Sequence, residues 1–150
     1  MLVCVDIVGI SKEEDGFLIR DTIEQTLLSM MPRRKKLVDI EVEICEEGDL
    51  GEAVGMLHKE DEDTFFMSLD RSIFEDPEYA ITVVCHETTH IVQHLRKHLK
   101  DINVDVKKWR GKLYNIADIN YFDLPWEVEA RLSELVIGSK IIEKYNGTTS

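Results

Sequence analysis

Residues 77–100 have the sequence PEYAITVVCHETTHIVQHLRKHLK, and this stretch carries the clearest helix signal in the chain. Pro77 suits the first position of a helix, Asp76 can cap the free backbone N–H groups, and Glu78 complements the positive end of the helix dipole. Apolar residues then recur at spacings of three and four. They are Ile81, Val84, Cys85, Ile91, Leu95 and Leu99. The stretch predicts one long amphipathic helix from Pro77 to about Lys100.

Within this helix, residues 86–90 form the pattern His-Glu-Thr-Thr-His. Positions i and i+4 share one helix face, so His86 and His90 can bind the same metal ion while Glu87 leans toward the same side. Cys85 points about 100° away, toward the apolar face. The pattern predicts the first half of a zinc site, with Glu87 positioned to act on a metal-bound water.

A catalytic zinc ion needs a third protein ligand and an open position for water. His94 lies about 12 Å from His86 along the helix axis, too far to share one ion. Better candidates lie on a second expected helix, which begins at Pro125 and ends at Asn146-Gly147. The apolar residues expected to form its buried stripe are Val128, Leu132, Leu135, Val136, Ile141, Ile142 and Tyr145.

Two glutamates stand near the start of this second helix. Glu127 has Arg131 at i+4, which is typical of a solvent-facing ion pair. Glu129 has a less charged neighbourhood, with Trp126 three residues before it and Ser133 four residues after it. We therefore favour Glu129 over Glu127 as the third ligand. Without the histidine motif, both would be ordinary first-turn glutamates that complement the helix dipole.

The histidine motif followed by the string Pro-Trp-Glu-Val-Glu-Ala at residues 125–130 resembles the gluzincin branch of the zincin metallopeptidases. In that branch the third ligand is a glutamate on a downstream helix. The string also resembles that of small phage and bacterial proteins assigned as metallopeptidases, which are little more than a zincin core. The similarity covers about residues 64–144. The metzincin pattern is not met, because Gln93 and Arg96 stand where it requires glycine and histidine.

The resemblance implies an α+β fold, with a small mixed or antiparallel sheet packed on the motif helix and on a C-terminal helix that carries the glutamate. It implies one Zn²⁺ per chain, bound by His86, His90 and Glu129. Thermolysin-like members carry an acidic residue four positions after the glutamate ligand, which orients a zinc histidine. Ser133 holds that position here, with Glu134 next to it, so we expect the Ser133 hydroxyl to support the site.

The function that this resemblance implies is that of a zinc-dependent metallopeptidase with Glu87 as general base. Tyr121 is the favoured donor to the developing oxyanion, ahead of Tyr114 and His94, because it lies in the segment leading into the Glu129 helix. The alternative is a non-catalytic zinc-binding domain that recognises a protein partner. Glu87 favours catalysis, since a structural metal site has no use for a carboxylate beside bound water.

The rest of the chain predicts strands, one further helix and connecting segments within a single domain over residues 1–150. We expect strands at 2–8 and 37–45, a helix at 17–31, and a hairpin formed by 53–58 and 64–69. The resemblance would make Thr64–Leu69 the exposed edge strand on which an extended peptide pairs. Residues 103–123 are expected to be an irregular connector, and residues 147–150 a frayed tail.

Charge and composition bound the partners. Eighteen Lys and Arg against 30 Asp and Glu give a formal net charge of −12, which opposes nucleic-acid binding and favours peptide or protein substrates of basic character. The basic cluster at 33–36 is interpreted as a solvated helix end. We expect Cys4, Cys45 and Cys85 to be buried thiols. With no leader and no apolar run of membrane-spanning length, the expected location is the cytoplasm.

Overall fold

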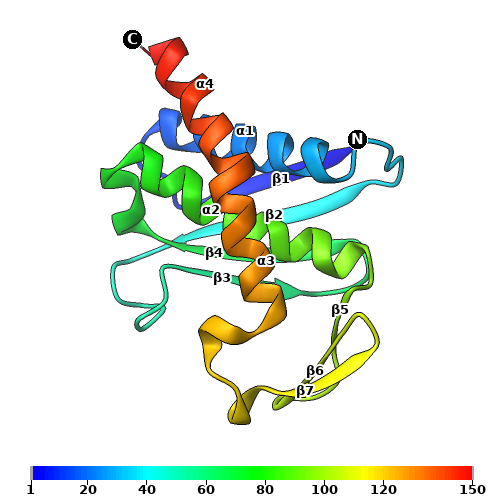
Figure 1. Cartoon of the computed structure of the whole chain (residues 1–150). Helices are drawn as coiled ribbons and strands as arrows, with labels where there is room; N and C mark the ends of the chain where they lie inside the picture. The colour runs from blue at the N-terminus through cyan, green and yellow to red at the C-terminus, as the bar shows by residue number, and fades with distance from the viewer. Residues whose placement is uncertain (1, 150) are drawn as a thin grey trace.

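The computed structural model describes residues 2–149 and shows an α+β fold in which helices cover one face of a mixed sheet (Figure 1). The sheet has four strands in the order β1-β2-β4-β3, with β1, β2 and β4 parallel and β3 antiparallel to β4. In chain order, the sheet and the helices of this part of the chain are β1 (Val3–Val8), α1 (Glu13–Met30), β2 (Val38–Cys45), β3 (Gly55–Lys59), β4 (Thr64–Asp70), η1 (Arg71–Glu75) and α2 (Pro77–Leu95).

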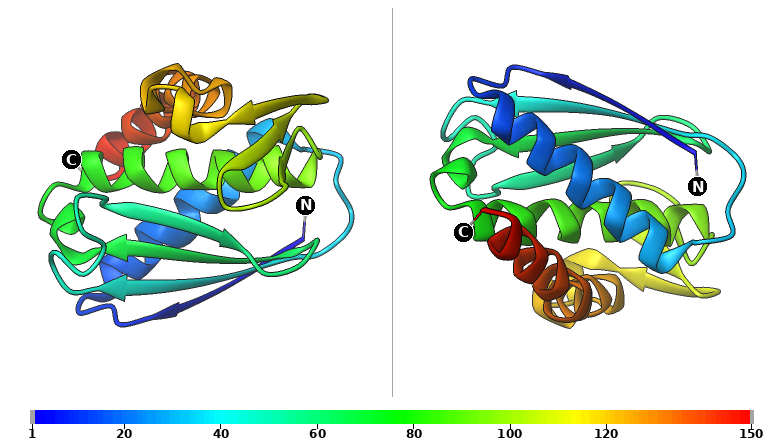
Figure 2. Two further views of the ribbon diagram at one scale, coloured as in Figure 1. Left: turned by 90° about the horizontal axis from the view of Figure 1, so that it is seen from below. Right: turned by 90° about the horizontal axis from the view of Figure 1, so that it is seen from above.

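The alternating sequence of β2 explains why the fold has two layers. Its apolar side chains at 38, 40, 42 and 44 are buried, whereas the acidic side chains at 39, 41 and 43 are exposed. Helices α1 and α2 pack on the apolar face and leave the acidic face open, as both views in Figure 2 show. The expected half-buried strand with a charged outer face is confirmed.

The expected hairpin is also confirmed, but its edge is a different strand. β3 pairs with β4 from Gly55 opposite Leu69 to Lys59 opposite Phe65, and β4 is enclosed between β3 and β2. The assignment of Thr64–Leu69 as the exposed edge is therefore wrong, because β3 takes that position. The unpaired edge of β3 lies near the histidine-bearing side of α2, because residues 55–57 line one cavity together with Glu87 and His90.

Helix α2 begins as predicted and ends earlier. The Asp76 carboxylate accepts from the backbone N–H of Glu78 at 3.0 Å and caps the first turn. The helix ends at Leu95, because Lys97 adopts a left-handed backbone with φ of 61° and the His98 N–H turns back to the Gln93 carbonyl at 3.0 Å. Leu99 then enters a strand, where the sequence predicted continued helix.

The segment after α2 forms a second, three-stranded antiparallel sheet in the order β5-β6-β7, where an irregular connector was expected. Its strands are β5 (Leu99–Asp101), β6 (Val106–Trp109) and β7 (Lys112–Asn115), and the turns η2 (Ile116–Asp118) and η3 (Tyr121–Asp123) follow. The strands are short and rich in lysine, so they lack the alternating pattern of β2. A small core of Leu99, Trp109, Leu124 and Trp126 attaches this sheet to the next helix.

The C-terminal helix is continuous in the view of Figure 1 and crosses α2. It comprises α3 (Pro125–Ser133), a π-helical turn η4 (Glu134–Gly138) and α4 (Ser139–Thr149). It therefore continues past the end predicted at Asn146-Gly147 to Thr149. Of the tail expected at 147–150, Ser150 lies outside the described residues.

Most of the apolar stripe predicted for this helix is not buried. Val128, Leu132, Leu135 and Val136 are 40%, 55%, 70% and 57% exposed, and Ile141 is the buried member. The face against α2 instead consists of small and polar residues together with one tryptophan. They are Trp126, Glu127, Ala130, Ser133 and Gly138. Small side chains let the two helices approach closely, as the buried contact of 3.7 Å between Cys85 Sγ and the Ser133 carbonyl shows.

The cysteines divide by exposure. Cys85 is buried as expected, Cys45 is half-buried and Cys4 is exposed, so the expectation of a buried thiol is wrong at Cys4. Cys4 lies on the outward-facing side of β1, the side the helices leave uncovered. Across residues 2–149, no helix has the length and apolar character needed to cross a membrane.

Candidate metal centre

The two motif histidines lie side by side on α2, with their ring centroids 4.9 Å apart. The Glu127 carboxylate from α3 faces both of them. Its Oε1 lies 2.9 Å from His86 Nε2 and its Oε2 lies 3.3 Å from His90 Nε2. One ligand atom from each of these three residues falls within 4.8 Å of the other two. Two imidazoles and a carboxylate at such spacing match the donor set of a zinc site with an open position.

The placement expected for the two glutamates is reversed. Glu127 is 6% exposed and faces the histidines, whereas Glu129 contacts Gln93 at 3.1 Å and Arg110 at 3.2 Å. The expectation that Glu129 faces His86 and His90 is therefore wrong. It followed from the spacing of Glu127 and Arg131, which was interpreted as a solvent-facing ion pair, but the Arg131 guanidinium instead donates to the Phe122 carbonyl.

Both histidines have a partner on the ring nitrogen that faces away from Glu127. His86 Nδ1 contacts a carboxylate oxygen of Glu134, and His90 Nδ1 lies 2.8 Å from Gln93 Oε1. Such partners fix the orientation of an imidazole and raise its basicity as a ligand. Glu134 follows Glu127 by seven residues, close to two helical turns, so both carboxylates face α2.

Ser133 does not take the supporting role expected of it. Its side chain is buried against α2, and its described contact is the one its carbonyl oxygen accepts from the Cys85 thiol. Glu134, the next residue, contacts His86 instead. Glu134 and Gln93 were both missed as site residues. The available signals were their spacings, three residues after His90 for Gln93 and seven after Glu127 for Glu134.

The site is strongly coupled electrostatically. Burial opposes the charged form of His86, but hydrogen bonds to Glu127 and Glu134 outweigh it and raise the pKa of His86 to about 10. Burial also opposes the charge on Glu127, yet hydrogen bonds from His86, His90 and Tyr121 hold the pKa of that carboxyl far below its usual range. The two shifts agree in direction and describe a buried ion pair.

Glu87 points into a cavity of about 170 Å³ that His90, Tyr121 and Glu127 also line. The residue is 7% exposed, and burial raises the pKa of its carboxyl despite the opposing effect of the two histidines. A Cβ atom at Gly55 on β3 would lie 3.0 Å from Glu87 Cγ, a tight contact that the Glu87 side chain would have to relieve by a small shift. Glycine at this position lets the edge strand pass directly over the Glu87 side chain.

Of the three residues considered as oxyanion donors, Tyr121 is the one in contact with a candidate ligand. Its hydroxyl donates to Glu127 Oε1 at 2.8 Å, and burial together with the Glu127 charge raises the pKa of the phenol. Tyr114 instead packs edge-on against Trp126 at 5.8 Å. His94 also lines this cavity, its ring centroid lies 6.1 Å from that of Phe65, and burial lowers its pKa to about 4.

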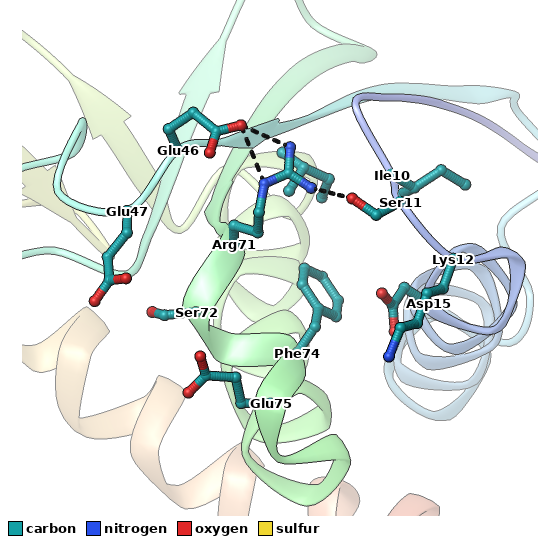
Figure 3. Close-up of a pocket in the computed structure, with 11 residues that line it drawn as sticks. Ile10, Ser11, Lys12, Asp15, Glu46, Glu47, Arg71, Ser72, Phe74 and Glu75 are labelled. Atoms are coloured by element: carbon teal, nitrogen blue, oxygen red, sulfur yellow. Dashed lines mark hydrogen bonds and ion pairs between the residues drawn. The ribbon is translucent and has the colours of Figure 1, made fainter.

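A larger cavity of about 330 Å³ lies at the carboxyl ends of the parallel strands β1, β2 and β4 (Figure 3). Its central cation, Arg71, is already engaged, at 3.0 Å from Glu46, 2.7 Å from Ser11 Oγ and 3.0 Å from the Gly9 carbonyl. The arginine therefore joins the loops after the three strands. The residues that combine the spacing of metal ligands with a buried carboxylate are His86, His90 and Glu127, which lie outside this larger cavity.

Comparisons of the chain with protein-family models, with curated proteins and with solved structures found no match.

Proposed function

We propose that this chain is a minimal zincin-like metallopeptidase in which His86, His90 and Glu127 hold one Zn²⁺. The observation that carries the proposal is the convergence of these three ligand atoms within 4.8 Å from two separate helices. The partners on both outer ring nitrogens support it, because they orient the lone pairs of the imidazoles inward. Bound zinc supplies a water of lowered pKa at its open position.

Glu87 is the general base of the proposed reaction. It lies one residue after His86, is almost fully buried and has a raised pKa, which brings the carboxyl closer to the pH at which proton transfer is efficient. It takes a proton from water and delivers it to the leaving amine. The Tyr121 hydroxyl lies at the rim of the same cavity, and to stabilise the oxyanion formed from the peptide carbonyl it would turn its proton from Glu127 Oε1 to the substrate.

The exposed edge of β3 provides the proposed docking site for the substrate backbone. β3 pairs with β4 on one side only, so its other side offers unpaired N–H and C=O groups to an extended peptide. Gly55 brings this edge over Glu87. The net charge of −12 favours substrates of basic character.

A second candidate function is a non-catalytic zinc-binding domain that recognises a protein. The exposed stripe on α3 and η4, formed by Val128, Leu132, Leu135 and Val136, favours it. The two functions differ at Glu87, which a purely structural metal site does not need.

The test is zinc stoichiometry and peptide hydrolysis on the wild-type protein and on the variants Glu127→Gln, Glu129→Gln, Glu87→Gln and Glu143→Gln. Glu127→Gln should weaken zinc binding by about 10-fold or more, because it removes a ligand. Glu87→Gln should keep the metal and lose hydrolysis. Glu143→Gln, an exposed glutamate on α4, is the matched control and should change neither.

The outcomes separate the two functions. Wild-type protein that binds no zinc would end both of them. Zinc binding that depends on Glu127, with no hydrolysis of any peptide in a broad library, would favour the interaction domain. Zinc lost in Glu129→Gln and kept in Glu127→Gln would contradict the ligand assignment made here.

A further inference from the structure

A chain of hydrogen bonds leads outward from His90 to the second sheet. His90 Nδ1 lies 2.8 Å from Gln93 Oε1. The amide nitrogen of Gln93 donates to the Trp126 carbonyl at 2.9 Å and to Glu129 Oε1 at 3.1 Å. The other carboxylate oxygen of Glu129 accepts from the Arg110 guanidinium at 3.2 Å. Helix α2, helix α3 and the β6–β7 hairpin are thus joined through one buried amide.

The direction of this chain is fixed by chemistry. A carbonyl and a carboxylate can only accept, so the Gln93 side chain must present its NH₂ group to Trp126 and Glu129. The opposite orientation of the amide would bring three oxygens together in a buried place, since Gln93 is fully buried. Gln93 Oε1 therefore faces His90.

An acceptor opposite Nδ1 determines where the neutral imidazole of His90 carries its proton. Nδ1 donates to Gln93, which leaves the lone pair on Nε2. Nε2 is the nitrogen that faces Glu127, at 3.3 Å. The chain of hydrogen bonds therefore selects the tautomer that a metal ligand needs.

Arg110 reaches Glu129 from a backbone conformation that arginine rarely adopts. Its φ is 49°, and that of the following Gly111 is 89°, so the two residues form the tight turn between β6 and β7. A left-handed backbone at a non-glycine residue is strained. The guanidinium also lies 5.2 Å from the centre of the Trp109 ring, so it stacks on the small core that Trp109 and Trp126 share.

We infer that Gln93 and Glu129 are positioning residues for His90, and that Arg110 makes the second sheet part of the candidate metal centre. This inference rests on the proposed function, because it assigns these residues to the orientation of a metal ligand. The hydrogen bonds that carry it join protein groups and do not need a bound metal. It also gives Glu129 a role that differs from the ligand role predicted from the sequence.

The experiment is side-chain ¹⁵N NMR of the histidines at alkaline pH, in a Glu127→Leu background kept in a chelator, because in the metal-free wild type the Glu127 carboxylate competes with Gln93 for the His90 proton. In this background, His90 should be in the Nδ1–H tautomer. In Gln93→Leu the signals should move to a mixture of the two tautomers, because the acceptor is gone. The signals of His86 serve as the internal control, since its Nδ1 contacts Glu134 and not Gln93.

Two further variants test the outer part of the chain. Arg110→Ala should shift the His90 tautomers in the same direction as Gln93→Leu but less, whereas Arg110→Lys should restore most of the wild-type pattern. Lys112→Ala is the matched control, because this residue lies on the same hairpin and stacks on Tyr114 at 5.2 Å. Zinc affinity, measured by competition with a chelator, should fall by about 10-fold in Gln93→Leu.

A His90 with its proton on Nε2 in the Glu127→Leu background, or an unchanged tautomer when Gln93→Leu is added to that background and the protein is folded, would overturn the inference. Should Gln93→Leu fail to fold, Glu129→Leu takes its place, because it removes one of the two acceptors that fix the orientation of the Gln93 amide. Because the tautomer is read without metal, a failure of the protein to bind zinc leaves this result intact. The two proposals therefore fail separately.

Discussion

Helices α2 and α3 meet at the candidate site, but they distribute their side chains in opposite ways. α2 buries its apolar residues, such as Ile81 and Ile91, and carries the two histidines beside them. The helix of α3 and η4 buries Trp126 but exposes its predicted aliphatic stripe, and it buries a carboxylate, Glu127, at 6% exposure. The difference shows that an apolar stripe identifies the buried face only where that face is packed against other apolar groups.

The reason lies in what each helix is packed against. α2 covers the sheet, so its inner face meets the apolar side of the strands. The α3 and η4 helix covers α2 itself, at the place where α2 presents His86, His90 and Glu87. Small residues and carboxylates are the ones that match this polar surface at close range. The contrast between the two helices can be tested through the stability of single variants.

The largest effect is expected in α2. Ile91→Ala should lower the free energy of unfolding by about 2–5 kcal/mol, because Ile91 is fully buried in the main core and truncation leaves a cavity. Chemical denaturation with two spectroscopic probes measures it. A decrease in the free energy of unfolding below about 1 kcal/mol would contradict the burial of Ile91 between α2 and the rest of the main core.

A middle-sized effect concerns the ion pair between the helices. The raised pKa of His86, about 10, means that its contribution to stability is complete below its unfolded value of 6.5 and is lost as the pH rises through 10. Glu127 acts in the opposite sense: its pKa is depressed, so its contribution is present above 4.5 and is lost as the pH falls. Both are therefore complete between about pH 4.5 and 6.5.

In chelator-treated protein, the free energy of unfolding should fall by on the order of 2 kcal/mol more between pH 6.5 and 10 in the wild type than in His86→Phe. Urea denaturation at a series of pH values gives both curves. Parallel curves would show that His86 and Glu127 are not paired in solution.

The smallest effect is expected on the outer face of the C-terminal helix. Leu135→Ser should change the free energy of unfolding by less than about 0.5 kcal/mol, because the side chain is 70% exposed. The measurement is a thermal or urea melt beside that of Ile91→Ala. A loss above 2 kcal/mol at low protein concentration would place Leu135 in a core and restore the burial predicted from the sequence.

Local patterns predicted most of the fold. The cap at Asp76, the alternation in β2 and the period of α2 each depend on residues near in sequence, and each is confirmed. The second sheet was missed because Lys107, Lys108 and Lys112 interrupt the apolar alternation expected of strands. These short strands are stabilised by packing against Trp126 of α3. Tertiary contacts of this kind leave no periodic signal.

The candidate site was predicted in the same uneven way. His86, Glu87 and His90 could be placed because they share one helix. The choice between Glu127 and Glu129 depended on which of them faces solvent, and it was inferred from an expected pair of Glu127 with Arg131, whose guanidinium instead donates to the Phe122 carbonyl. Gln93 and Glu134 stand at helical spacings from His90 and Glu127, but spacing alone does not show which polar side chains become buried when the two helices pack.

The open face of the sheet has a consequence for how molecules of this protein meet one another. Asp6 on β1 lies beside Glu41 on β2, and Asp39 and Glu43 extend the same row, all of them exposed. Like charges on a flat surface repel a second copy, and salt screens this repulsion over about 10 Å at 0.1 M. We therefore expect this row to disfavour stacking of the uncovered face of the sheet on the same face of a second molecule, whereas α1 and α2 cover the opposite face.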